Sequence, residues 1–386
     1  MYRIKTYNKI SKAGLSVFDD KYTVGNEVEN ADGAIVRSAA LHEEQFPGSL
    51  LAISRAGAGT NNIPIERCSS EGIVVFNTPG ANANAVKELV IAGLFLSSRK
   101  IVDGILWANS LKGGENDVGK AVEKGKSAFA GPEIKGKSLG VIGLGAIGAM
   151  VANAAAGLGM KVYGYDPYLS VRSALNLDHS VNYISDLKDI YRSCDYITVH
   201  VPLMDSTKGL IGAEAVALMK DGVRILNFSR GALVDSAAML SALENGKVAA
   251  YVTDFPSEEM LGVPGVIAIP HLGASTPESE DNCAQMAAEQ LIDYIENGNI
   301  VNSVNLPVIT MPRSSEKRIC IIHKNIPNTL TAITGIVARD GVNIENMLNK
   351  SKGDYAYTML DVAPTDYDKV ATELEAVNGV IRVRVI

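Results

Sequence analysis

Short apolar runs alternate with helix-compatible segments over most of the chain. The runs are apolar nearly throughout, which is typical of strands that have helices on both faces of their sheet. Such alternation predicts an α/β fold with parallel sheets and right-handed crossovers. We expect strands within residues 33–38, 50–57, 72–80, 138–145, 161–166, 196–203, 223–229, 249–255 and 266–272, and a helix over 85–101.

The pattern changes towards the carboxyl end. A helical stretch begins near Pro277, carries one apolar face and ends near Gly298, a suitable C-cap residue. Residues 302–317 contain proline and serine without periodicity and are typical of a linker. Beyond them the order strand–helix–strand–strand–helix–strand predicts a separate, ferredoxin-like domain.

Length and charge narrow the range of functions. A chain of 386 residues is too long for one compact core, so we expect two or three domains. The net charge of −7 argues against nucleic acid or an anionic membrane as a partner, because both reward clustered lysine and arginine. The amino-terminal segment lacks the apolar core of a signal peptide, and the apolar stretch at 89–98 is too short to cross a bilayer.

The four cysteines, at positions 68, 194, 283 and 320, have no CxxC or CxxH spacing. They indicate buried, reduced thiols rather than a disulfide framework or a metal site. We therefore expect a cytoplasmic protein without a bound metal.

A glycine-rich motif follows the expected strand before residue 143. Gly143-x-Gly145-x-x-Gly148 opens an alanine-rich helix, and the next strand ends at Asp166, 18 residues past the last glycine. This context matches the dinucleotide-binding fingerprint, in which glycines allow a tight turn and close approach of a pyrophosphate. An acid at position 166 would bind the ribose hydroxyls and repel a 2′-phosphate, so we predict NAD. The alternative is a structural turn followed by an incidental aspartate.

Three further motifs follow expected strands and supply charged groups. Residues 227–235 contain Arg230, residues 254–259 contain two glutamates, and residues 270–276 contain His271. Taken singly they are explained by a surface cation, a solvated acidic loop and an ordinary histidine at a strand end. Together they are what hydride transfer at a 2-hydroxy acid requires. The guanidinium binds the carboxylate, the imidazole takes the hydroxyl proton, and an acid fixes the imidazole's tautomer.

With these residues the chain resembles the D-isomer-specific 2-hydroxyacid dehydrogenases. The resemblance rests on GLGAIG, HVPLMDSTKGLIG, NFSRGALVD and PHLGAST, together with a carboxyl-terminal domain of the ACT type. It implies a Rossmann cofactor domain inserted in a flavodoxin-like substrate domain. The expected parts are a substrate domain of residues 1–95 and 281–305, an NAD domain of residues 96–280, a linker of residues 306–316 and an ACT domain of residues 317–386.

The resemblance also implies functional residues. Arg230, Glu258 and His271 take the catalytic roles. The implied cofactor-binding residues are Gly143, Gly145, Ala146, Ile147, Gly148, Asp166, His200, Pro202, Phe228, Ser229, Arg230, Asp254, His271, Gly273 and Ala274.

The acidic loop departs from the family pattern. The family usually reads Asp-x-Phe-x-x-Glu-Pro, whereas residues 253–260 read TDFPSEEM. Alignment on Phe255 makes Glu258 the partner of His271, and alignment on Asp254 makes it Glu259. We prefer Glu258, because this choice keeps the carboxylate's offset from the local turn.

For the substrate, the resemblance implies NAD-dependent oxidation of D-3-phosphoglycerate to 3-phosphohydroxypyruvate, the entry to L-serine synthesis. Arg55, Asn82, Arg230 and His271 are the implied substrate ligands. One alternative is reduction of another 2-oxo acid, such as glyoxylate, hydroxypyruvate or 2-oxoglutarate. Another is a nucleotide-sensing scaffold without catalysis.

The ACT domain suggests regulation. His323, Asn325 and Asn343 match the residues with which related ACT interfaces bind L-serine, so the resemblance implies serine inhibition in a homo-oligomer, a dimer or a tetramer. Inhibition by restrained domain closure requires that serine bind the inhibited conformation more tightly. The alternative is that the domain only drives oligomerisation. Asn328 stands where relatives commonly have glycine, so the local turn can differ.

Overall fold

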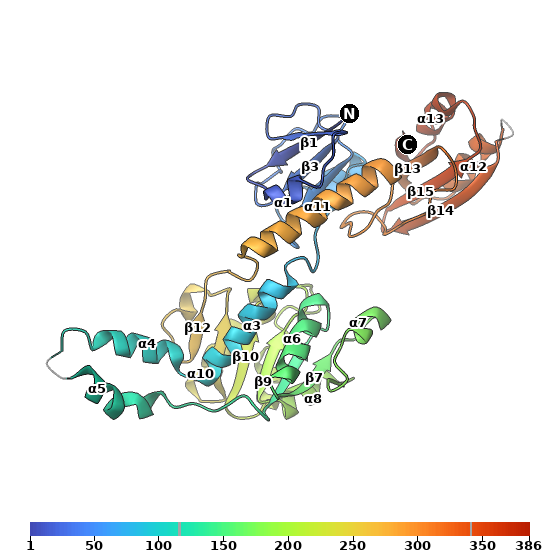
Figure 1. The fold of residues 1–386 in the computed structure, drawn as a ribbon. Helices are drawn as coiled ribbons and strands as arrows, with labels where there is room; N and C mark the ends of the chain where they lie inside the picture. Colours follow the sequence, from blue (N-terminus) through green and yellow to red (C-terminus); the bar gives the residue numbers. More distant parts are fainter. Residues whose placement is uncertain (115–116, 340–341) are drawn as a thin grey trace. The chain divides into compact units, whose positions relative to one another are not determined.

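A computed structural model describes residues 1–114, 117–339 and 342–386 of the chain. The described residues form two compact units (Figure 1). The first comprises Met1–Ala81 and Pro277–Ile386, and the second comprises Asn82–Thr276. The second unit is therefore inserted, in sequence, into the first.

The first unit contains a five-stranded parallel sheet in the order β2-β1-β3-β4-β5. Its elements are β1 (Tyr2–Tyr7), α1 (Lys12–Leu15), β2 (Tyr22–Gly25), β3 (Gly33–Val36), β4 (Ala52–Arg55), α2 (Ile65–Ser70) and β5 (Val74–Phe76). The inner strands are buried because apolar clusters lie on both faces of the sheet.

A long helix, α11 (Pro277–Asn297), covers one face of this sheet. Its buried stripe repeats every three or four positions, from Cys283 through Leu291 to Ile295, as expected for one face of a helix. Gly298 follows at φ +73°, the left-handed conformation that commonly ends helices.

The second unit contains a seven-stranded parallel sheet in the order β12-β11-β10-β9-β6-β7-β8. Its strands are β6 (Ser138–Ile142), β7 (Lys161–Tyr165), β8 (Asn182–Tyr183), β9 (Tyr196–Val199), β10 (Val223–Asn227), β11 (Val248–Thr253) and β12 (Val266–Ala268). All neighbours are parallel, so the carboxyl ends of the strands meet at one edge, where such sheets bind ligands.

Helices lie on both faces of this second sheet. On one face α3 (Ala83–Ser98) and α6 (Ala146–Gly157) share a core with the strands. On the other lie α8 (Leu187–Ser193), α9 (Ala213–Leu218) and α10 (Ser236–Glu244). The short helices η2 (Gly231–Leu233) and η3 (Glu258–Met260) also contribute to this second core. The short helix α7 (Val171–Leu175) lies instead beside α6, where Leu169 and Leu177 pack on the first core.

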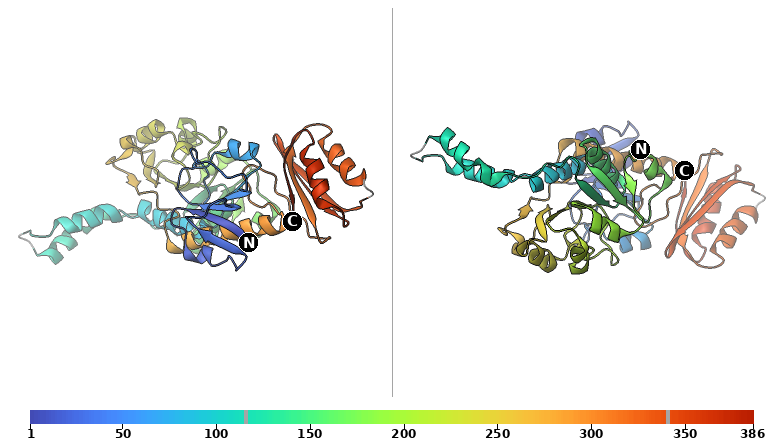
Figure 2. Two further views of the ribbon diagram at one scale, coloured as in Figure 1. Left: turned by 90° about the horizontal axis from the view of Figure 1, so that it is seen from above. Right: turned by 90° about the horizontal axis from the view of Figure 1, so that it is seen from below.

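A helical arm projects from the body of the second unit (Figure 2). It consists of α4 (Ile101–Ser110), α5 (Val118–Gly125) and η1 (Lys126–Phe129). Neither α4 nor α5 has a buried residue. Within the described ranges, no helix has the combined length and apolar character that a membrane span requires.

The carboxyl-terminal domain lies within the first unit. It runs β13 (Arg318–Lys324), α12 (Thr329–Arg339), β14 (Ile344–Lys352), β15 (Tyr355–Val362), α13 (Tyr367–Glu375) and β16 (Val380–Val385). The antiparallel sheet has the order β14-β15-β13-β16. One face packs on α12 and α13, while Cys320, Tyr357 and Met359 on the other face join the core around α11.

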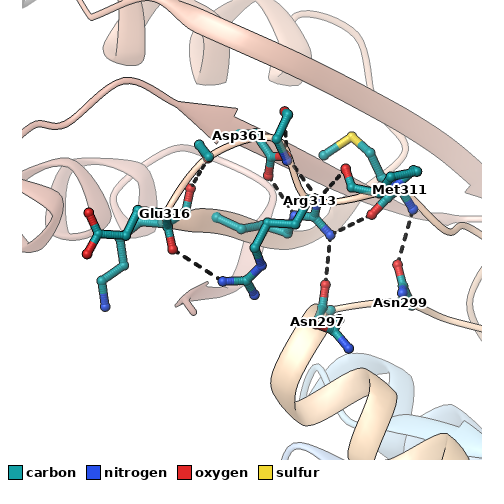
Figure 3. Close-up of polar contacts among 12 residues, drawn as sticks. Asn297, Asn299, Met311, Arg313, Glu316 and Asp361 are labelled. Atoms are coloured by element: carbon teal, nitrogen blue, oxygen red, sulfur yellow. Dashed lines mark hydrogen bonds and ion pairs between the residues drawn. The ribbon is translucent and has the colours of Figure 1, made fainter.

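A buried ion pair joins this domain to α11 and to the linker (Figure 3). Arg318 donates to the Asp361 carboxylate at 2.7 and 2.9 Å, and both side chains are fully buried. Its other N–H groups donate to the carbonyls of Asn297, Met311 and Pro312 at 2.8–3.0 Å. Every donor of this guanidinium therefore has an acceptor.

The predicted fold class is confirmed, and so is the ferredoxin-like order of the last domain. The domain boundaries differ in detail. The predicted break at 95/96 lies inside α3, whereas the units divide at 81/82 and 276/277, because the whole of α3 packs on β10, β11 and α6. Asn328 has φ +68°, the left-handed conformation that a glycine would adopt there and that asparagine tolerates.

Candidate active site

The glycine-rich turn lies directly after β6, and two of its glycines are sterically required. Gly143 has φ +94°, and a Cβ on it would lie 2.7 Å from the His200 carbonyl oxygen. A Cβ on Gly148 would lie 1.9 Å from the carbonyl oxygen of Gly143. Gly145 is exposed, and a Cβ there would meet nothing within 4 Å, so this face of the turn is open to a ligand.

The first backbone N–H groups of α6 have no side-chain cap among the described residues. No side chain caps the helix at Gly145, and the first helical residues are Ala146, which is exposed, and Ile147, which is partly buried. Asp166 stands beside the turn and accepts hydrogen bonds from the backbone N–H of Leu144 and of Tyr168, both at 2.9 Å. An open glycine turn, a free helix N-terminus and a fixed acid fit a dinucleotide with an unphosphorylated ribose.

His200 follows β9 and contacts the glycine turn through its backbone. Its N–H donates to the Ile142 carbonyl at 2.7 Å, and its Nε2 lies 2.9 Å from the Thr198 hydroxyl. Burial lowers the pKa of His200 to about 4, so the imidazole is neutral near pH 7. Pro202, two residues on, is exposed.

The loop after β10 is held by a buried asparagine. Asn227, with no exposed surface, donates through Nδ2 to the Arg230 carbonyl at 2.9 Å and accepts from the Ser229 N–H at 3.1 Å. Ser229 donates its hydroxyl to the Val199 carbonyl, and the ring of Phe228 is buried in the core against Gly93 of α3. The loop thereby presents the exposed side chain of Arg230 at the carboxyl edge of the sheet.

Arg230 and His271 share one aromatic neighbour. The ring of Phe255 lies 4.4 Å from the imidazole of His271, centroid to centroid, and the Arg230 guanidinium carbon lies 5.9 Å from the Phe255 ring centre. The three residues follow β10, β11 and β12, which are neighbours in the sheet. A cation for a carboxylate and a base for a hydroxyl proton thus meet at one edge.

Of the three acids in the loop after β11, only Asp254 is buried. It is 1% exposed, and neither carboxylate oxygen forms a hydrogen bond of normal geometry within the described residues. Burial raises the pKa of Asp254, while the charge of His271, the nearby Gly273 N–H and the charge of Arg230 act in the opposite direction. Glu258 and Glu259 are exposed on η3, and Glu259 faces the hydroxyls of Ser257 and Ser236.

The segment after His271 closes over Asp254. Gly273 is buried, and a Cβ on it would lie 3.3 Å from Val86 of α3 and 3.4 Å from the Asp254 Oδ2. Ala274 is partly buried. The backbone at Gly273 therefore passes directly beside the carboxylate.

The predicted substrate ligands fall in both units. Arg55 ends β4 in the first unit, where its Nε donates to the Arg37 carbonyl at 3.2 Å. Its guanidinium lies against Gly57, whose added Cβ would come within 2.3 Å of Nη1. Asn82 precedes α3 in the second unit and does not cap the helix with its side chain.

The predicted effector residues lie at opposite ends of one ACT sheet. His323 is buried, with Nδ1 2.9 Å from the Lys324 carbonyl and Nε2 2.9 Å from the Thr358 hydroxyl. Asn325 is exposed near Gly353, whereas Asn343 is exposed beyond the other end of β15, where its carbonyl accepts from Ala363. Six residues of β15 separate the two ends, roughly 20 Å at 3.4 Å per residue.

Sequence reasoning missed two residues of this edge. Asn227 was considered only as part of the NFSRG motif, although a polar residue that ends an apolar strand is a signal for a side chain that holds the following loop. Phe255 served only to align the acidic loop, and nothing in its local sequence indicated contact with both His271 and Arg230. Within residues 1–114, 117–339 and 342–386, no cluster of three or more His, Cys, Asp or Glu could hold a metal ion.

Comparison with known proteins agrees with this geometry. The family described as D-isomer specific 2-hydroxyacid dehydrogenase, NAD binding domain, matches residues 105–273, and an AHAS small subunit-like ACT domain matches residues 319–382. D-3-phosphoglycerate dehydrogenase from Haemophilus influenzae is 32% identical over 87% of this chain and 81% of its own length. The Escherichia coli K12 enzyme of the same name is 33% identical over 87% and 82%.

Among solved structures, an NAD+-bound 3-phosphoglycerate dehydrogenase from Entamoeba histolytica is similar to this chain. It is 28% identical, with a TM-score of 0.61, over 79% of this chain and 98% of its own.

Proposed function

Because the chain belongs to the family of D-isomer-specific 2-hydroxyacid dehydrogenases, we propose that it oxidises D-3-phosphoglycerate to 3-phosphohydroxypyruvate at the carboxyl edge of the second unit's sheet. The enzyme is NAD-dependent. The reaction would supply the oxo acid from which L-serine is made.

The observation that carries this proposal is the shared contact of Arg230 and His271 with Phe255, beside an open glycine turn. Arg230 would bind the substrate carboxylate through paired hydrogen bonds, which fixes carbon 2 relative to the imidazole. His271 would accept the hydroxyl proton while the C2–H bond breaks, and a carbonyl forms at carbon 2. NAD, when bound, supplies the acceptor for the hydride.

Cofactor selection would rest on Asp166. Its carboxylate is fixed by two backbone N–H groups, and its remaining lone pairs would accept hydrogen bonds from the ribose hydroxyls of NAD. We propose Gly143, Gly145, Gly148 and the first turn of α6 as the pyrophosphate site.

A substrate panel tests the activity most directly. NADH oxidation would be followed with 3-phosphohydroxypyruvate, hydroxypyruvate, glyoxylate and 2-oxoglutarate at equal concentrations. We expect the highest kcat/KM for the phosphorylated acid. A clear preference for one of the other three would contradict the proposed substrate, and the enzyme would then be a reductase of that acid.

We propose that L-serine binds between two ACT domains of different subunits. One serine cannot contact His323, Asn325 and Asn343 of the same domain, since about 20 Å separates the two ends of the sheet. A two-fold interface would bring Asn343 of one copy to His323 and Asn325 of the other.

The variants Asn325→Ala and Asn343→Ala test this arrangement, since both residues are exposed. Each should abolish serine inhibition without changing turnover. Serine inhibition that persists in both variants would contradict the proposal and leave the ACT domain as an assembly element.

We propose that the chain forms a homo-oligomer in the cytoplasm. The arm carries an apolar stripe on α4, where Ile101, Val102, Ile105 and Leu106 are 42, 39, 55 and 65% exposed. Such a stripe is typical of a surface that a second copy covers. The four cysteines are all free and buried, as expected in a reducing compartment. Light scattering of wild type and Leu106→Arg would test the assembly.

A further inference from the structure

The carboxyl end of α11 lacks the charges that usually stabilise a helix end. The backbone dipole places a partial negative charge there, and helices commonly carry lysine or arginine in the last turn. The helix α11 contains six acids and no lysine or arginine, and two of the acids, Asp293 and Glu296, lie in its last two turns. The last four carbonyls of a helix also have no backbone partner within it. The end of α11 therefore needs donors from outside the helix.

Three arginines from outside the helix supply these donors. The bonds run from Arg384 to the carbonyls of Tyr294 and Ile295 at 3.3 and 2.8 Å, from Arg313 to that of Glu296 at 2.8 Å, and from Arg318 to that of Asn297 at 2.9 Å. Arg384 belongs to β16 and Arg318 to β13, which are neighbours in the ACT sheet. Each of the last four carbonyls of α11 thus accepts from a cation, and the ACT domain supplies three of the four bonds.

The ACT sheet also covers the apolar side of the helix end. Tyr357 of β15 donates its hydroxyl to the Gly298 carbonyl, directly after α11, at 2.8 Å. Tyr357 and Cys320 lie in one apolar core with Leu291 and Ile295 of α11. The face of the ACT sheet opposite α12 and α13 is therefore covered by the same helix that its arginines cap.

The segment between α11 and β13 is not built as a free hinge. Its largest apolar side chains are no more than 4% exposed; they are those of Leu306, Ile309 and Met311. On one side of the segment, the Asn305 side chain accepts from the Val75 N–H of β5 at 2.8 Å. On the other side, Lys350 and Lys352 of β14 donate to carbonyls of the segment at 3.0–3.1 Å. The segment is thus bonded to the parallel sheet and to the ACT sheet at once.

The amino end of α11 lies at the carboxyl edge of the parallel sheet in the first unit. Glu280, in the first turn of the helix, pairs with Arg37 at 2.7 Å. Arg37 directly follows β3, and its carbonyl accepts from the Nε of Arg55 at the end of the neighbouring strand β4. Parallel sheets bind ligands at this edge, and Arg55 is a predicted substrate ligand. The 21 residues of α11 span about 31 Å, so one helix connects the ACT domain to this edge.

We propose that the ACT domain acts on the substrate edge of the first unit through α11, whose carboxyl end it caps, and not through a swing about the linker. The ACT domain, α11 and the parallel sheet move as one body. An effector that shifts β13 or β16 displaces the capped end of α11 and, with it, the pair of Glu280 and Arg37. The inference goes beyond the proposed reaction, and only its last readout rests on the proposed serine site.

The first test compares Arg384→Met with Arg382→Met, two removals of a guanidinium from β16. The acceptors of Arg382 are the carbonyls of Gly48, Leu50 and Glu71. Arg382 is the matched control, because it belongs to the same strand and none of its acceptors lies in α11. Hydrogen exchange of the full chain, followed by mass spectrometry, measures protection of the last two turns of α11.

We expect exchange at the end of α11 to rise about tenfold or more in Arg384→Met, because two carbonyls lose a charged donor. In Arg382→Met it should change less than twofold. Arg384→Lys keeps the charge with fewer donors and should give a smaller rise, and it serves as the second variant if Arg384→Met does not fold. Equal exchange of α11 in the Arg384 and Arg382 variants would overturn the cap.

The second readout tests whether the first unit is one body. Exchange at increasing denaturant gives separate unfolding midpoints for the amides of β13 and β15 and for those of β3 and β4. We expect the two midpoints to coincide in wild type and to fall together in Arg384→Met. ACT amides that open at a lower denaturant concentration than β3 and β4 in wild type would show a separate body and contradict the inference.

The third readout is inhibition by L-serine, expressed as the ratio of initial rates with and without serine. In Arg384→Met and in Glu280→Gln we expect calorimetry to show serine binding within tenfold of the wild-type Kd, while the rate ratio approaches one. Glu278→Gln is the control, because Glu278 is exposed in the same turn as Glu280, and it should keep the wild-type ratio.

The outcomes separate this inference from the proposed regulation. Full serine inhibition in both Arg384→Met and Glu280→Gln would overturn the route through α11. If serine does not inhibit the wild-type protein, the proposed effector fails, and the exchange readouts still decide whether the ACT domain caps α11 and moves with the parallel sheet.

Discussion

Two acids are buried in the described part of the chain, and their surroundings are opposite. Asp361, in the first unit, accepts from Arg318 at 2.7 and 2.9 Å and from the backbone and hydroxyl of Ser314 at 2.7 and 2.8 Å. Asp254, in the second unit, accepts no bond of normal geometry from the described residues. A fully bonded buried charge fixes architecture, whereas an unbonded one beside a base is available to chemistry.

The largest loss of stability is expected when the buried ion pair of Arg318 and Asp361 is broken. Arg318→Met leaves Asp361 buried without its cation and removes five hydrogen bonds that join β13, α11 and the linker. We expect the first unit to lose about 3–5 kcal/mol of unfolding free energy. Hydrogen exchange of the β13 and β15 amides, followed by mass spectrometry, measures this loss for that unit alone.

The activity of the folded Arg318→Met protein should match wild type, since Arg318 lies in the first unit and outside the catalytic edge. The double variant Arg318→Met, Asp361→Leu removes both charges and should recover most of the loss. Protection of β13 equal to wild type in the single variant would show that this pair does not fix the domain.

A smaller loss is expected in Asp361→Asn, with a defined pH dependence. Burial acts to raise the pKa of Asp361, but hydrogen bonds from Arg318 and Ser314 outweigh it and leave the pKa below its ordinary value. The acid therefore stabilises the fold above its unfolded pKa, and this contribution disappears as the pH falls through the lower, folded pKa. We expect a loss of about 2 kcal/mol at pH 7. Denaturant unfolding between pH 7 and pH 2 should show the difference from wild type shrinking only in the acid range.

The smallest expected change in unfolding free energy is a gain rather than a loss, and it concerns Asp254. Burial raises the pKa of Asp254 in the folded protein above its value in the unfolded chain, so the ionised carboxylate destabilises the fold. This destabilisation is complete above the folded-state pKa and absent below the unfolded-state pKa. Asp254→Asn should therefore gain about 1 kcal/mol at pH 7 while it loses turnover, as expected where a site stores unfavourable charge. Hydrogen exchange of the β10 and β11 amides measures the gain. A loss of protection there would contradict the contrast between the two acids.

Both acids also show what the sequence could and could not predict. The strand and helix pattern predicted the Rossmann layer, α11 and the ACT order, because each is a local periodicity with a clear end signal, such as Gly298. The glycine turn and Asp166 were predictable for the same reason. The pairing of Arg318 with Asp361 spans 43 positions between antiparallel strands, and no local pattern indicates it.

The sequence identified individual residues of the site, but it did not predict the contacts among them. Arg230, His271 and Asp254 were all named from motifs, but Asp254 only as a cofactor residue, because sequence alone gives neither its burial nor its missing partners. The preference for Glu258 rested on the family's spacing and stays a prediction. The arm of α4 and α5 was not predicted, because helices without a buried face have no core-facing stripe to signal them.

In the proposed reaction the imidazole of His271 moves the substrate proton, and replacement of this one side chain tests that role. His271→Gln would be compared with wild type in the initial rate of NADH formation from D-3-phosphoglycerate, with NADH affinity measured by fluorescence titration. We expect kcat to fall by about 10²- to 10⁴-fold with NADH affinity unchanged. A kcat within tenfold of wild type would contradict it.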